Sequence, residues 1–155
     1  MINAKNELDK MILYVGHGGQ ITKNVVKELT SRGLQANVYT LSSAILSKNK
    51  EKIYHIYSEL IESGVDINVL INLTSKTMKD NLLVNLLLEQ GLTQGDIALK
   101  MGVGNNRAYY LVKDAKLLDI NNIKEYIIKL SELDYNIKSG QVDPKTGFEF
   151  FLFGL

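Results

Sequence analysis

The spacing of apolar residues constrains the fold of this chain most strongly. Apolar side chains recur at intervals of three and four along most of the 155 residues, and the chain contains a single proline. These intervals place side chains on one face of an α-helix, and a lone proline leaves long helices uninterrupted. We therefore expect an all-α protein of about eight helices, without an internal repeat.

The C-terminal segment is expected to be a packing element. All four phenylalanines fall in the last eight residues, directly after Asp143 and Pro144: they are Phe148, Phe150, Phe151 and Phe153. Asp143 can cap a helix, and Pro144 can occupy its first position, where a missing N–H costs nothing. The resulting helix over residues 144–155 is apolar on nearly every side, so it must be buried in the core or against another chain.

Capping residues and glycines divide the rest of the chain into helices. We expect them over residues 3–15 or 6–15, 22–32, 40–47, 50–63, 67–90, 93–101, 105–115 and 121–137, with N-caps at Thr22, Thr40, Asp66, Thr93 and either Asn121 or Asn122. A domain boundary is expected between residues 35 and 36. The middle of the long helix, residues 74–81, is polar apart from Met78, so we expect it to face solvent or a partner.

Composition limits the functions open to the chain. With 45% hydrophobic residues it is long enough for one sizeable domain, and the absence of cysteine excludes disulfides, thiolate metal sites and cysteine nucleophiles. A formal charge of +1 gives no global attraction to nucleic acid or to a membrane surface. The longest apolar run, residues 82–88, is interrupted by Asn85 and is too short to span a bilayer. We expect a soluble, intracellular protein.

Catalytic and metal-binding patterns are not found in the sequence. Catalysis needs groups that converge on a reacting atom, and the carboxylates here are spread without the spacing that a hard cation requires. His17 lies in a glycine-rich turn and is interpreted as a solvated loop residue, whereas His55 is interpreted as a surface or core-edge residue of its helix. We expect no enzyme activity, cofactor or metal. An enzyme that uses either histidine is the least favoured hypothesis.

Residues 93–115 have the outline of a helix-turn-helix. A DNA-reading version would place residues 105–107, the start of its second helix, against base edges in the major groove. Phosphate anchoring takes several basic residues, and those nearby are Lys100, Arg107 and Lys113, balanced in part by acidic neighbours. A packed helical corner is therefore the favoured interpretation, and a DNA-binding regulator remains the alternative.

Several short motifs occur along the chain in a fixed order. They are Asn6-Glu7-Leu8-Asp9-Lys10, Leu13-Tyr14, Ile21-Thr22, Asn37-Val38-Tyr39-Thr40-Leu41, Ala44-Ile45, Leu86-Leu87, Glu89-Gln90-Gly91-Leu92, Ile97-Ala98, Met101-Gly102-Val103, Leu133-Asp134 and Ile137-Lys138-Ser139-Gly140-Gln141-Val142-Asp143-Pro144. Over nearly the whole chain, their order and spacing resemble the C-terminal part of the delta subunit of bacterial DNA polymerase III, a clamp-loader subunit. Val25, Ser43 and the Asn105-Asn106 pair depart from that family's pattern.

The resemblance implies a division into two helical parts. Residues 1–35 would be part of a small helical lid domain of the AAA type, and residues 36–155 would be a C-terminal helical collar domain. The family's N-terminal region, with its nucleotide-fold core and the element that opens the sliding clamp, would lie before Met1. We therefore expect that Met1 is not the natural start of the longer protein.

The resemblance implies assembly as the function. The collar would hold the delta subunit in a ring with the delta-prime and tau or gamma subunits, in a complex that loads the sliding clamp onto primed DNA in the bacterial cytoplasm. This chain would not be catalytic, although the parent complex is a DNA polymerase holoenzyme, and it would reach the clamp only through the missing N-terminal region. The expected subunit interface comprises Tyr109, Tyr110, Val112 and Phe151, and the expected DNA-facing residues are Arg107, Lys138 and Gln141.

Overall fold

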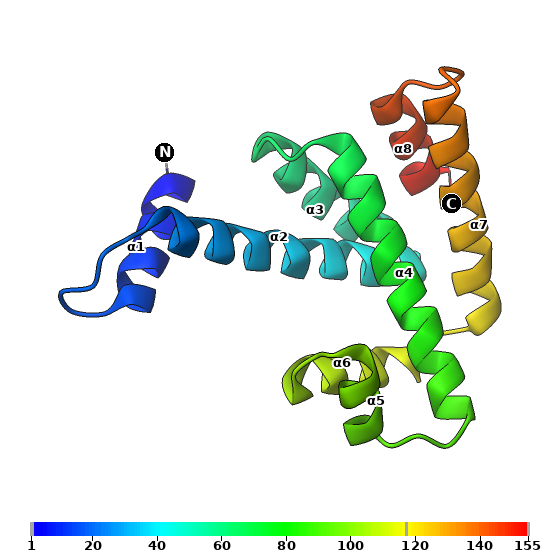
Figure 1. Ribbon diagram of the computed structural model, residues 1–155. Coiled ribbons are helices and arrows are strands. Elements are labelled where there is room, and N and C mark those ends of the chain that lie inside the picture. Colours follow the sequence, from blue (N-terminus) through cyan, green and yellow to red (C-terminus); the bar gives the residue numbers. More distant parts are fainter. Residues whose placement is uncertain (1, 117, 155) are drawn as a thin grey trace. The chain divides into compact units, whose positions relative to one another are not determined.

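The structure is a computed structural model that describes residues 2–116 and 118–154 (Figure 1). Over those residues the secondary structure is helical without a strand, which confirms the expected all-α class. The helices are α1 (Ile2–Val15), α2 (Lys23–Leu46), α3 (Lys50–Glu62), α4 (Ile67–Glu89), α5 (Gln94–Met101), α6 (Asn105–Ala115), α7 (Ile120–Lys138) and α8 (Pro144–Phe153). The prediction about Met1 falls outside the described residues.

The chain divides into two compact units, Met1–Asn37 and Val38–Leu155. The first unit holds α1 and the first part of α2, where the Tyr14 hydroxyl donates a hydrogen bond to the Glu28 carboxylate at 3.3 Å. The second unit holds the rest of α2 and helices α3 to α8. The assignment of these parts to a lid and a collar stays a prediction.

The two helices expected between residues 22 and 47 are one helix, α2. Gly33, expected as a stop, and Thr40, expected as an N-cap, both lie inside it. An interior glycine lowers the stability of a helix by about 1 kcal/mol relative to alanine, which weakens the helix without ending it. Gly33 has no positive φ, so the chain does not leave the helical conformation there. After it, buried Val38 and Leu41 continue an apolar face whose packing stabilises the helix.

Most of the expected helix ends are confirmed. The side chains of Asp66, Thr93 and Asp143 accept hydrogen bonds from backbone N–H groups of the first turns of α4, α5 and α8, at distances between 2.8 and 3.3 Å. Pro144 occupies the first turn of α8 as expected. Helix α7 begins earlier than expected because Asp119, rather than either asparagine after Ile120, is its N-cap.

Helix α4 lies at the centre of the second unit. It packs against α6, α7 and α8, and Figure 1 shows α7 running alongside it, with the α5–α6 pair near its C-terminal end. At that end a cluster of buried side chains joins α4, α5 and α6, with Tyr39 of α2 packed against it. The cluster contains Val84, Leu87, Ile97, Leu111, Val112 and Ala115. The hydrophobic core of this unit is therefore organised along one helix.

The expectation that the polar middle of α4 faces outward was wrong for Thr74 and Asn81. Thr74, Met78 and Asn81 are buried, whereas Lys76 and Lys79 are exposed. The three buried residues recur at intervals of four and three and continue the apolar face of the helix, so the packing of α4 decides their burial despite their polarity. The buried Thr74 Oγ1 and Asn81 Oδ1 atoms have no hydrogen-bond partner among the described residues.

Helix α8 buries one face in the core of this chain and exposes another, so burial of the exposed face against another chain stays a prediction. Phe148 and Phe151 stack with their ring centroids 5.9 Å apart, and Phe148 also contacts Tyr57 of α3 at 6.1 Å. The Tyr57 hydroxyl donates a hydrogen bond to the Glu149 carboxylate at 3.0 Å. The pKa of Tyr57 is raised, mainly by burial and to a smaller extent by this hydrogen bond. Phe150 points outward and is 80% exposed.

We predict that Gly147→Ala destabilises the fold. A Cβ at this position would lie 2.5 Å from Leu133 Cδ1 and 2.6 Å from Val142 Cγ1, where α8 meets the end of α7. Overpacking of this kind costs roughly 1 to 3 kcal/mol, measurable by urea unfolding followed by circular dichroism. Gly95→Ala is the matched control, because its Cβ would meet only the Thr93 hydroxyl at 3.8 Å. Equal urea midpoints for the two variants would contradict the prediction.

We also predict that Asp143 contributes to acid sensitivity. The hydrogen bonds from the Thr146 backbone N–H and hydroxyl lower the pKa of Asp143 below its ordinary value of 3.8. The ionised Asp143 carboxylate therefore stabilises the folded state. This stabilisation is complete above the pKa of Asp143 in the unfolded chain and is lost as the pH falls through the lower pKa of the folded state. Asp143→Asn keeps a capping oxygen, so it should lose less stability than the wild type between about pH 6 and about pH 3. Identical acid losses in urea titrations would refute the assignment.

Candidate functional site

The first candidate surface is the corner formed by α5 and α6. Tyr109 and Tyr110 on α6 are 51% and 56% exposed, and their rings meet edge to face with centroids 5.4 Å apart. Leu99 on α5 is 84% exposed. Exposed aromatic and apolar side chains on a rigid helical support are typical of protein-interaction surfaces. The structure therefore places two of the predicted interface residues on an accessible surface.

The other two predicted interface residues lie inside the chain. Val112 is 8% exposed and belongs to the cluster between α4, α5 and α6. Phe151 is 9% exposed and contacts the rings of Phe148 and Tyr126. Their side chains support the fold and are not available as surface anchors in this structure. The four residues do not form one surface, because α6 and α8 lie near opposite ends of α4 (Figure 1).

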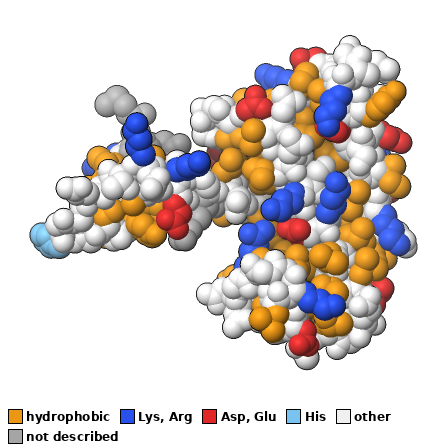
Figure 2. All heavy atoms as spheres, viewed as in Figure 1, with side chains coloured by type: hydrophobic (Ala, Val, Ile, Leu, Met, Phe, Trp, Pro, Cys, Tyr) orange, Lys and Arg blue, Asp and Glu red, His pale blue; other side chains and the backbone are white. Residues whose placement is uncertain are grey.

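The predicted DNA-facing residues do not come together. Arg107 begins α6, where its Nη2 lies 3.7 Å from Asp80 Oδ2. Lys138 ends α7, with its Nζ 2.6 Å from Asp134 Oδ2, and Gln141 is exposed in the turn that follows. Each cation already has a carboxylate partner, and the two lie near opposite ends of the second unit (Figure 1). In Figure 2 basic side chains are interspersed with acidic ones on the visible face and do not form one continuous basic surface.

Tyr39 attaches the α5–α6 corner to α2. Its ring packs against the buried cluster, and its hydroxyl donates a hydrogen bond to the Asp114 carboxylate near the end of α6. The pKa of Tyr39 is raised, mainly by burial and to a smaller extent by this hydrogen bond. The contact fixes the helix that presents Tyr109 and Tyr110.

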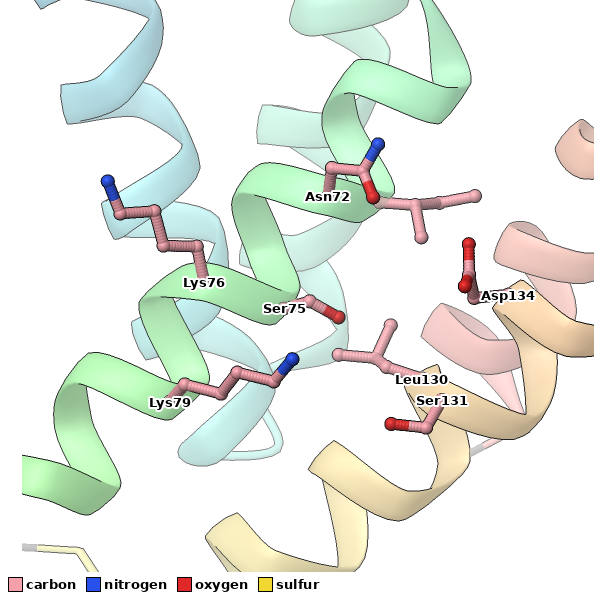
Figure 3. Close-up of a pocket in the computed structure, with 8 residues that line it drawn as sticks. Asn72, Ser75, Lys76, Lys79, Leu130, Ser131 and Asp134 are labelled. Carbon is pink, nitrogen blue, oxygen red and sulfur yellow. The ribbon is translucent and has the colours of Figure 1, made fainter.

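A groove lies between α4 and α7. It has a volume of about 340 Å³ and is lined by Ile71, Asn72, Ser75, Lys76, Lys79, Leu130, Ser131 and Asp134 (Figure 3). The polar middle of α4 was predicted from the sequence as a candidate surface, whereas this groove was not predicted. The exposed lysines of that segment were the available signal, and the α7 wall could not be assigned without the packing of the two helices.

Neither histidine belongs to these surfaces. His17 is exposed in the turn after α1, and His55 is exposed on α3, where its Nδ1 lies 3.7 Å from Glu59 Oε1. Within residues 2–116 and 118–154, no group of three His, Asp or Glu side chains is placed to hold a metal ion. None of the helices in the described part of the chain is long and apolar enough to cross a membrane.

Two strongly exposed apolar residues of the second unit, Leu99 and Phe150, were not predicted as surface residues from the sequence. For Phe150 a signal was present, because a helix with apolar residues on every side cannot bury them all against one neighbouring face. Phe148, Phe151 and Leu152 share the buried side of α8, which leaves Phe150 outside. Leu99 follows two buried residues of a short helix, and no sequence pattern marks it as exposed.

Comparisons with known proteins identify relatives of this chain. The family model described as DNA polymerase III delta subunit, C-terminal domain, matches residues 35–155. The DNA polymerase III subunit delta of Bacillus subtilis (strain 168) is 26% identical over 149 residues, which cover 96% of this chain and 43% of that protein. A solved structure of the Bacillus subtilis DNA clamp loader delta protein superimposes with a TM-score of 0.75 and 26% identity, over 96% of this chain and 44% of that one. The chain therefore spans less than half the length of both relatives.

We predict that Tyr39→Phe destabilises the second unit. The change removes the hydroxyl that binds Asp114 and leaves a half-buried carboxylate without that donor. A hydrogen bond to a charged group contributes roughly 1 to 3 kcal/mol, so the urea midpoint should fall. Tyr54→Phe is the control, because this exposed hydroxyl makes no hydrogen bond in the described structure. An unchanged midpoint for Tyr39→Phe would show that the bond contributes nothing to stability.

Proposed function

Because the chain belongs to the family of C-terminal domains of the DNA polymerase III delta subunit, we propose that it joins a clamp-loader delta subunit to its neighbours. The observation that carries this proposal is the family match over residues 35–155, and the structural likeness to a clamp loader delta protein supports it. The partners are the delta-prime and tau or gamma subunits. The second unit acts as the collar, and the first unit is part of a lid domain.

The surface of the second unit supports a role in protein assembly. The exposed rings of Tyr109 and Tyr110 lie on a helix whose opposite face, including Ala108 and Leu111, is buried. Aromatic anchors held in fixed positions lose little conformational entropy on binding, and such residues carry much of the binding energy of protein interfaces. We assign the subunit contact to this corner, with the buried Val112 as its support.

The activity of the whole complex is a further part of the proposal. The parent complex loads the sliding clamp onto primed DNA in the bacterial cytoplasm, and nucleotide polymerisation belongs to that holoenzyme. This chain contributes assembly, and contact with the clamp is made by the N-terminal region of the longer delta subunit. Phe150 and Tyr135, both strongly exposed, are further apolar surface residues of the collar.

The alternative of a DNA-binding regulator is not favoured. The family match includes the whole of residues 93–115, so the α5–α6 corner is part of the delta-subunit domain. Arg107, which would read a base edge, is instead paired with Asp80 of α4. A recognition helix would need this guanidinium free for the major groove and several more phosphate contacts around it.

The test is size-exclusion chromatography with light scattering. The chain is measured alone and mixed with the C-terminal regions of delta-prime and of tau or gamma from the same organism. We expect a stable mixed complex that the double variant Tyr109→Ser/Tyr110→Ser weakens by roughly tenfold or more. Tyr135→Ser, which changes a more exposed tyrosine on α7, is the control.

Three outcomes are informative. A chain that binds neither partner at concentrations well above micromolar would overturn the proposed assembly. A complex that forms equally well with the double variant would keep the assembly and refute the assignment of its interface. A circular dichroism spectrum identical to that of the wild type establishes that each variant is folded.

A further inference from the structure

We propose that polar contacts at the two ends of α6 set the direction in which its exposed tyrosines point. Arg107 in the first turn of α6 contacts Asp80 of α4. Asp114 in the last turn contacts Tyr39 of α2. These four residues act as positioning residues for the subunit contact at the α5–α6 corner. The inference rests on the proposed function for its partner, whereas the orientation of α6 can be measured without one.

The two contacts lie on one edge of α6. Arg107 and Asp114 are seven residues apart, so they have nearly the same angle around the helix and are about 10 Å apart along its axis. Tyr110 lies between them on the helix surface, three residues after Arg107 and four before Asp114. A rotation or tilt of α6 that breaks either contact would therefore redirect the Tyr110 ring.

The ends of α6 are poorly stabilised by the helix itself. Its N-cap is Gly104, which has no side chain to accept a backbone hydrogen bond, whereas α5 begins with a complete capping box. A cation near the N-terminus and an anion near the C-terminus both oppose the helix dipole, and Arg107 and Asp114 occupy these places. Lys113 in the last turn offsets part of this effect. The partners on α4 and α2 therefore account for the placement of both charges.

The buried face of α6 does not set this direction by itself. Two of its four buried residues are alanines, Ala108 and Ala115, and the other two are Leu111 and Val112. Apolar contacts are non-directional, and small side chains make few interlocking contacts that would oppose rotation of a helix. A hydrogen bond depends on distance and angle, and an ion pair depends on distance. The polar contacts therefore add a constraint that the apolar face lacks.

The two contacts also lie within electrostatic range of one another. The Arg107 Nη2 atom is 3.7 Å from Asp80 Oδ2. The pKa of Tyr39 is raised mainly by burial and then by Asp114, and the positive charge of Arg107 acts on it in the opposite direction. The four residues thus form one polar cluster at the junction of α2, α4 and α6.

The test is a distance measurement on the full chain. The sequence contains no cysteine, so cysteines introduced at the exposed Lys52 of α3 and Lys113 of α6 are the only thiols that take up nitroxide labels. We expect pulsed electron paramagnetic resonance to give a single narrow distance distribution in the otherwise wild-type chain. Arg107→Glu and Tyr39→Phe should each broaden or shift it, because α6 then adopts further orientations. Unchanged distributions in both variants would overturn the proposal.

A charge exchange separates a positioning role from direct contact with the partner. Arg107→Glu should weaken binding to the partner of the proposed assembly by roughly fivefold or more. The double variant Arg107→Glu/Asp80→Arg should restore both the binding and the narrow distance distribution. A change on α4 would not rescue a residue that touched the partner, so persistent loss of binding in the double variant would refute the positioning role. Lys129→Glu is the matched control, because it reverses a positive charge in an ion pair that lies within α7.

Failure of the assembly and failure of the positioning role give different results. A wild-type chain that binds neither partner would overturn the proposed assembly, and the label distances would still decide whether the two contacts orient α6. Arg107→Gln removes the charge without reversing it, and it should broaden the distances to a smaller extent than Arg107→Glu. Broader distances in the single variants and recovery in the charge exchange, each with a wild-type circular dichroism spectrum, support the proposal.

Discussion

The packing of α4 against its neighbours is the interaction on which the second unit depends. This one helix contacts α6, α7 and α8, and its C-terminal end shares a buried cluster with both helices of the α5–α6 corner. The corner carries the exposed tyrosines, and α7 supplies the second wall of the groove. Both candidate surfaces are therefore positioned by the same hydrophobic packing, although different side chains form them. Substitutions on the buried face of α4 would disturb the two surfaces together.

The sequence was informative wherever structure is decided locally. Caps at Asp66, Thr93 and Asp143 depend on one side chain and the N–H groups of the next turn, so residue type and position are sufficient to predict them. The apolar spacing likewise predicted the all-helical class. The prediction that a helix ends at Gly33 was wrong, because the packing of Val38 and Leu41 outweighs the low helix propensity of one glycine.

The candidate sites were harder to predict because exposure is a tertiary property. Tyr109 and Tyr110 are accessible, yet Val112, on the same helix, is in the core. A signal for Val112 was present, because Ala108, Leu111, Val112 and Ala115 recur at helical spacing and mark the buried face of α6, which leaves the two tyrosines outside it. The groove required the register of α4 against α7, which residues far apart in sequence determine. Thr74 and Asn81 show the same limit, since their polarity predicted exposure and their position in α4 buries them.

The short connections of this fold have a consequence for how it forms. Residues 102–104 alone join α5 to α6, and residues 139–143 join α7 to α8, so each pair closes a small loop with little loss of chain entropy. The pairing of α4 with α7 instead encloses the whole α5–α6 segment. Contacts close in sequence form at lower entropic cost, so we expect the two helical hairpins to form before this longer closure, an order that amide protection during refolding reports directly. The groove between α4 and α7 would then be among the last features of the native structure to appear.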